Sequence, residues 1–147
     1  FLAAAVGGLA PLRDGWSEAH VKVAPWALRH LRRSAAERTN ALGTMHVSWR
    51  VNGSSGDAHG GDAFELNASL PNGMAAVVDL PLVAGADSAK AGNCVVDCGG
   101  TSRAPECSRY VVTGCRSVPR SPSGDRFLRI RVGSGHHGFV VPFGGSI

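Results

Sequence analysis

Hydrophobic and polar residues alternate along most of the chain, as they do in half-buried β-strands whose successive side chains point to opposite faces. The clearest case is residues 45–51, where Met45, Val47, Trp49 and Val51 share one face and polar residues occupy the other. We therefore expect Trp49 in the core. The same pattern predicts further strands at residues 20–25, 64–70, 75–82, 127–132 and 138–143.

Turn signals separate these strands. Pro71-Asn72-Gly73 combines a residue that fixes φ with two that tolerate left-handed conformations, and Gly133-Ser134-Gly135 predicts a hairpin between the last two strands. Residues 53–62, rich in Gly, Ser, Asp and His, predict an exposed hairpin loop. Two antiparallel sheets bury such alternating faces most simply, so the predicted fold class is all-β, an antiparallel two-sheet β-sandwich.

Two segments depart from this alternation. Residues 26–38 are rich in Ala, Leu, Arg and Glu and follow Pro25, so local propensity predicts a helix there. Residues 1–8 are apolar, compatible with a helix and end in Gly7-Gly8, which suggests either a short remnant of an upstream helix or a frayed terminus.

Length, composition and charge argue against a membrane-spanning protein and against a nucleic-acid-binding protein. The 147 residues are enough for one domain, and no apolar run approaches the ~20 residues of a membrane-spanning helix. The net charge is +4, but only Arg29, Arg32 and Arg33 cluster, and no aromatic residues interleave with them. We therefore expect no nucleic-acid partner and no membrane span.

Four cysteines lie close together, with the spacing C-x3-C-x8-C-x7-C at Cys94, Cys98, Cys107 and Cys115. Zinc sites usually need a C-x2-C pair, so two disulfides are favoured over a metal, with all three pairings open. The sequons at Asn52 and Asn67 fall on predicted solvent faces and suggest N-glycosylation. Cysteines and sequons together predict an extracellular or secretory-pathway location.

Candidate catalytic chemistry is sparse. Asp57, His59 and Asp62 lie in the Gly-rich segment, where solvated polarity is favoured over a metal site. No paired carboxylates, nucleophile motif or cofactor motif is evident, so we expect no catalytic, cofactor-binding or metal-binding residues. His136 and His137 are interpreted as surface histidines of a turn. Two tryptophans besides Trp49 are assigned to packing, Trp16 and Trp26.

One series of segments covers roughly residues 1–82 and 126–143. It comprises Gly8-Leu9-Ala10-Pro11, Gly15-Trp16, Val21-Lys22-Val23-Ala24-Pro25, residues 43–50 (GTMHVSWR), residues 64–81 (FELNASLPNGMAAVVDLP) and Val132-Gly133-Ser134-Gly135. As a series, these segments resemble the C-terminal β-sandwich domain of bacterial-type α-L-rhamnosidases. The resemblance is lost over about 83–125, where the family has a short connection and this chain has its cysteines.

The resemblance implies a domain organisation. Residues 1–10 would be the end of the last helix of an upstream (α/α)6 barrel with its connector, and residues 11–147 a β-sandwich with a Cys-rich insertion at about 83–125. The family also places a strand near 28–38 that turns at 39–43 into the next strand. This expectation replaces the helix that propensity predicts.

The resemblance also implies a function. Enzymes of this family invert the anomeric centre with a general acid and a general base, both in the barrel and outside this chain. The chain would then be a non-catalytic sandwich that packs on the upstream catalytic barrel of the same polypeptide and stabilises it. Two alternatives remain: a stand-alone carbohydrate-binding module, which predicts exposed aromatic residues along a groove, and a structural extracellular glycoprotein component that has lost catalysis, with carbohydrate or extracellular assembly partners.

Overall fold

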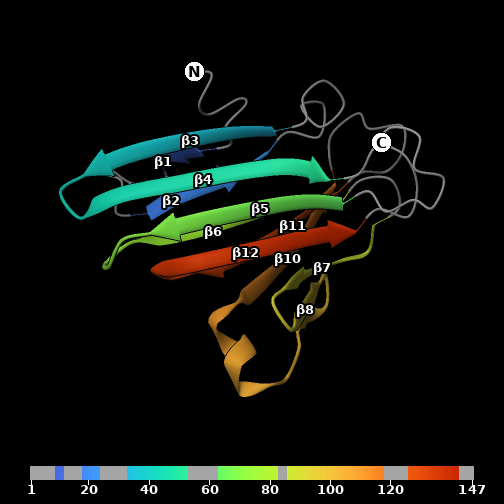
Figure 1. Cartoon of the computed structure of the whole chain (residues 1–147). Coiled ribbons are helices and arrows are strands. Elements are labelled where there is room, and N and C mark those ends of the chain that lie inside the picture. The colour runs from blue at the N-terminus through green and yellow to red at the C-terminus, as the bar shows by residue number, and fades with distance from the viewer. Residues whose placement is uncertain are drawn as a thin grey trace.

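A computed structural model describes residues 9–11, 18–23, 33–52, 63–82, 86–117 and 126–142. These residues form strands in two layers and one short 3-10 helix, η3 (Pro105–Arg109) (Figure 1). The strands are β1 (Leu9–Pro11), β2 (Glu18–Lys22), β3 (Arg33–Asn40), β4 (Gly43–Asn52), β5 (Ala63–Leu70), β6 (Ala75–Leu82), β7 (Ser88–Ala91), β8 (Cys94–Asp97), β9 (Gly100–Thr101), β10 (Val111–Ser117), β11 (Arg126–Val132) and β12 (Gly135–Pro142).

The strands form a five-stranded sheet in the order β1-β2-β6-β11-β10 and a seven-stranded sheet in the order β3-β4-β5-β12-β7-β8-β9. The expected all-β, two-sheet sandwich is confirmed. One strand pair differs from the expectation, because β2 and β6 run parallel while the other pairs are antiparallel. Between β2 and β6 the chain builds β3, β4 and β5 in the opposite sheet, and it then returns in the direction in which β2 runs.

The core lies between the two sheets and follows the alternation in the sequence. Met45, Val47 and Trp49 of β4 are at most 2% exposed, and they share one continuous apolar cluster with Leu80 and Ile130 from the five-stranded sheet. The expectation that Trp49 belongs to the core is therefore confirmed.

Residues 33–40 form strand β3, so the helix that propensity predicts is wrong over 33–38. The strand of the family resemblance is present, starting at Arg33 and continuing to Asn40. Its whole length pairs with β4, from Arg33 opposite Arg50 to Asn40 opposite Gly43, and this ladder outweighs a weak local preference. The remainder of the segment, residues 26–32, lies outside the described residues.

The two glycine turns predicted from the sequence carry the chain from one sheet to the other. At the first, the Met74 N–H donates to the Pro71 carbonyl at 3.2 Å, and Gly73 takes the positive φ of +89° that other residues rarely adopt. At the second, the predicted hairpin is wrong: β11 belongs to the five-stranded sheet and β12 to the seven-stranded sheet. A local turn signal marks a reversal but does not specify which strands pair.

The cysteine-containing segment is built into the sandwich. Strands β7, β8 and β9 extend one edge of the seven-stranded sheet, and β10 forms an edge of the five-stranded sheet. In the described part of the chain, no helix is long and apolar enough to cross a membrane.

Candidate functional site

Three side chains from three strands converge on the outer face of the five-stranded sheet. Asp79 of β6 lies opposite Arg129 of β11 in the strand register, and His20 comes from β2 on the other side. Arg129 donates from Nε to Asp79 Oδ1 at 2.9 Å and from Nη2 to Oδ2 at 3.0 Å, and His20 Nε2 lies 2.7 Å from Oδ2. Only 2% of Asp79 is exposed.

These partners determine the charge of Asp79. Burial alone raises the pKa of its carboxyl group, but hydrogen bonds from His20 and Arg129, together with electrostatic attraction from both side chains, outweigh burial and lower the pKa to about 2. Asp79 therefore stays ionised at ordinary pH. A carboxylate held in this way does not exchange protons near neutral pH, so the cluster is suited to fixing three strands rather than to acid–base chemistry.

The sequence pattern predicts that Asp79 lies on a strand, but it does not identify the partner of Asp79. The available signal was a charged residue inside the apolar run of residues 75–82, because a buried charge needs a partner. Its partners are 50 and 59 residues away in the chain, and no local pattern identifies them.

The four cysteines form two disulfides, Cys94 with Cys107 and Cys98 with Cys115. All four thiols are consumed, so the cluster has none left for a metal ion. The first bond ties β8 to η3. The second ties the turn after β8, in the seven-stranded sheet, to β10 in the five-stranded sheet. Among the described residues no group of His, Cys, Asp or Glu is arranged to hold a metal ion.

The interpretation of both histidines of the last strand as surface residues of a turn is half wrong. His136 is exposed, but His137 is only 1% exposed. Strand β12 starts at Gly135, earlier than predicted, so His137 shares the inward face with Phe139 and Val141.

Hydrogen bonds fix the tautomer of His137. Its Nε2–H donates to the Gly133 carbonyl at 2.8 Å, and its Nδ1 accepts from Arg109 Nη2 at 3.0 Å. Burial lowers the pKa of His137, the Gly133 bond opposes this, and the charge of Arg109 lowers it further. The net shift is downward, so the ring is neutral at neutral pH. His137 thus joins the corner after β11 to η3.

An open depression of about 660 Å³ lies on the outer face of the seven-stranded sheet. Its lining includes the small side chains of Ala35 and Ser48 beside Asn67, and an exposed ion pair in which Arg50 Nε lies 2.6 Å from Glu65 Oε2. The Asn67 side chain is exposed and lies over the adjacent β12 strand. There its amide oxygen would be 3.1 Å from a Cβ placed on Gly138.

Of the remaining residues singled out in the sequence, one lies at the end of a described strand and the others lie outside the described residues. Asn52 is the last residue of β4. Asp57, His59 and Asp62 of the predicted loop fall outside the described residues, as do the two other tryptophans, Trp16 and Trp26.

The described residues expose no aromatic side chain that could stack on a sugar ring. The large apolar side chains exposed in the described ranges are Leu42, Val95 and Val111, and none of them is aromatic. The described aromatic side chains are buried, including Phe64, whose ring centroid lies 5.9 Å from that of Trp49. The carbohydrate-binding module requires exposed rings, which this part of the chain does not show.

The two-sheet fold of this chain also occurs as a small part of solved α-L-rhamnosidases. The chain is similar over 95% of its length to the α-L-rhamnosidase from Dictyoglumus thermophilum, with a TM-score of 0.61 and 15% identity, and covers 12% of that chain. It is also similar over 95% of its length to the Streptomyces avermitilis α-L-rhamnosidase complexed with L-rhamnose, with a TM-score of 0.54 and 21% identity, and covers 10% of that chain.

At these identities the similarity establishes the fold, and it confirms the resemblance inferred from the sequence segments. The chain spans only about a tenth of the length of either enzyme. No family model matches the sequence, and no curated protein sequence matches it either.

Proposed function

We propose that the chain is the non-catalytic C-terminal β-sandwich of a secreted, α-L-rhamnosidase-like glycoside hydrolase, and that it packs on the catalytic barrel of the same polypeptide. The observation that carries the proposal is the fold match: nearly the whole chain superposes on a small part of two such enzymes. The state of Asp79 agrees with a structural role, since this buried carboxylate is bound by two partners and remains ionised.

The outer face of the five-stranded sheet is the better candidate for the barrel interface. The chain enters this sheet through β1 and β2, next to the proposed connector. Its outer face combines the ion cluster of Asp79, Arg129 and His20 with two apolar side chains, Val77 and Phe127, and Phe127 is only 6% exposed. The outer face of the seven-stranded sheet is polar throughout β4 and β5, with His46, Ser48, Arg50, Glu65, Asn67 and Ser69.

Two matched charge reversals test this choice of face in the full-length protein. Arg131 and Arg50 are each more than half exposed and each pairs with one glutamate, at 3.5 Å and 2.6 Å. We expect Arg131→Glu to shorten the half-life of aryl α-L-rhamnoside hydrolysis at elevated temperature, because it would place an unpaired carboxylate beside Glu18 in the proposed interface, where water is excluded. Arg50→Glu should leave the half-life close to wild type. Equal effects from the two variants would show that the five-stranded sheet does not face the barrel.

The two lysines provide an independent check. Lys22 projects from β2 beside the Phe127 ring, and Lys90 lies on β7 in the other sheet. In the full-length protein, amine labelling should modify Lys90 faster than Lys22, and the difference should vanish in denaturant. Fast labelling of Lys22 in the native protein would argue against a covered face.

Secretion is the second part of the proposal. Two disulfides favour an oxidising compartment, and Asn67 presents an exposed amide in a sequon. The intact mass of the natural, unreduced protein should fall on enzymatic removal of N-glycans, with Asn67 converted to Asp. Ser69→Ala should abolish this conversion at Asn67. Unmodified Asn67 in protein from the natural source would refute glycosylation there.

A further inference from the structure

The two disulfides differ in their surroundings. Cys94 and Cys107 are 3% and 1% exposed and belong to the core. Cys98 and Cys115 are only partly buried and pack against the core from its margin. A reagent approaching the folded protein therefore reaches the Cys98–Cys115 bond more readily.

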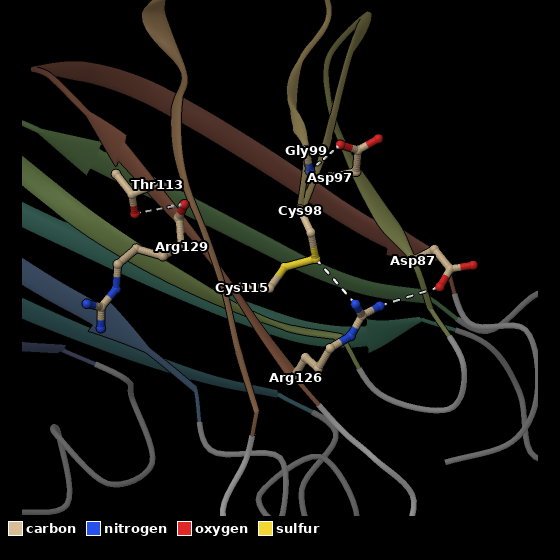
Figure 2. The surroundings of a disulfide bond; sticks show 8 residues. All are labelled: Asp87, Asp97, Cys98, Gly99, Thr113, Cys115, Arg126 and Arg129. Atoms are coloured by element: carbon tan, nitrogen blue, oxygen red, sulfur yellow. Dashed lines mark hydrogen bonds and ion pairs between the residues drawn. A yellow bond between two sulfur atoms is a disulfide. The ribbon is translucent and has the colours of Figure 1, made fainter.

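A cation lies against one sulfur of the partly buried bond. Arg126 Nη1 lies 3.4 Å from Cys98 Sγ, and Figure 2 shows the guanidinium group directed at this sulfur rather than at Cys115. The second nitrogen, Nη2, lies 3.5 Å from Asp87 Oδ1. The Asp87 side chain is 92% exposed, so solvent screens its charge and it neutralises the guanidinium group only weakly.

Asp97, the acidic residue next to Cys98 in the chain, does not cancel the positive charge of Arg126 at the Cys98 sulfur. Asp97 precedes Cys98, but its carboxylate accepts the Gly99 N–H at 2.9 Å and points away from the disulfide (Figure 2). A thiolate formed on Cys98 would therefore face a positive charge, which stabilises the ionised form of a cysteine.

We propose that Cys98–Cys115 is the thiol–disulfide exchange site of this domain, and that an incoming thiolate attacks Cys115 so that Cys98 departs as a thiolate against Arg126. The fitting reactant is a thiol or a protein dithiol of the oxidoreductase class. Exchange is faster when the leaving sulfur is the more stable thiolate, and this selects Cys98 as the leaving group.

The electrons balance in this step. The incoming sulfur forms a new S–S bond to Cys115 Sγ as the old bond breaks, and the electron pair of that bond goes to Cys98 Sγ. When the reagent is a dithiol, its second thiolate then attacks the reagent sulfur that is bonded to Cys115. This closes the disulfide of the reagent and releases Cys115 as a thiolate. The domain disulfide is reduced by two electrons and the dithiol is oxidised to a disulfide.

The first experiment identifies the sulfur that is attacked. The full-length, folded protein is treated briefly with glutathione, quenched with acid, alkylated and analysed as peptides. We expect glutathione on Cys115 and the alkyl group on Cys98, with the Cys94–Cys107 bond intact. Glutathione on Cys98, or earlier opening of Cys94–Cys107, would overturn the proposal.

The second experiment measures the contribution of Arg126. An uncharged phosphine such as tris(hydroxypropyl)phosphine reduces the bond without being attracted by the cation, so its rate reports leaving-group stabilisation. Arg126→Gln should slow opening of Cys98–Cys115 by about three- to tenfold, and Arg126→Lys should largely retain the rate.

Arg116 supplies the matched control. It is the exposed residue that follows Cys115 on β10 and lies opposite Phe127, and successive side chains of a strand point to opposite faces. Arg116→Gln should change the rate by less than about twofold. Unfolding of the Arg126→Gln variant would accelerate reduction, so a slower rate cannot arise from damage to the fold. A rate for Arg126→Gln that is unchanged or increased would refute the role of Arg126.

Discussion

Replacing Asp79 by Asn should destabilise the folded domain at neutral pH but not in strong acid. The substitution keeps the shape of the side chain and removes its charge from the contacts with Arg129 and His20. The carboxyl pKa is about 2 in the folded protein against 3.8 for the free group. At about 1.36 kcal/mol for each tenfold change in the acid constant, this difference corresponds to roughly 2.5 kcal/mol.

Proton binding by Asp79 determines the direction in which stability changes with pH. Because the folded-state pKa of Asp79 lies below its unfolded value, the stabilisation is fully present above about pH 4 and is lost as the pH falls toward about 2. Urea unfolding at pH 7 should therefore give a free energy of unfolding about 2 kcal/mol lower for Asp79→Asn, and the gap should close near pH 2.

Glu65→Gln is the control for this experiment. Glu65 and Arg50 are separated by only 2.6 Å, but Arg50 is 63% exposed, so the loss should stay below about 1 kcal/mol. If Asp79→Asn cost no more than Glu65→Gln, or if its gap to wild type persisted in acid, the charge of Asp79 would not stabilise the fold.

Three further predictions concern the core and the edges of the sandwich. Trp49→Ala should lower the free energy of unfolding by about 3–5 kcal/mol in urea titrations, and a loss below about 1 kcal/mol would place the ring outside the core. Removing the Cys94–Cys107 bond by substituting both cysteines with alanine should lower the free energy of unfolding by about 2–4 kcal/mol, because the bond closes a loop of 13 residues. Calorimetry of the oxidised variant and wild-type proteins measures the difference. The lowered pKa of His137 means that the unfolded chain binds a proton more readily, so stability should fall as the pH drops below about 6.5. His137→Gln should flatten this pH dependence, and an unaltered slope would exclude His137 as its source.

Alternation in the sequence predicted strands β2, β4, β5, β6, β11 and β12, because each inward position must be apolar; it did not predict β1 or the short strands β7 to β10 around the cysteines. Met45, Val47 and Trp49 face the core for this reason, and the strands follow with small shifts at their ends. The two-layer architecture follows in turn, since such strands have one face to bury.

Pairing between distant strands could not be predicted in this way. The alternation tells which face of β12 is apolar, but not that the strand crosses to the other sheet and pairs with β5. The missed start of β12 at Gly135 left His137 assigned to the surface. The ion cluster at Asp79 was missed because its partners become neighbours only once β2, β6 and β11 are side by side.

The two strands closest to the end of the described chain occupy interior positions in the sheets: β11 lies between β6 and β10, and β12 lies between β5 and β7. During synthesis, neither sheet is complete until residues 126–142 have left the ribosome. Until then the nascent chain exposes unpaired edges of four strands, a period in which chaperones bind and wrong pairings form. Ribosome-stalled chains that end before residue 126 should therefore remain sensitive to protease, and resistance should appear abruptly once β12 has emerged.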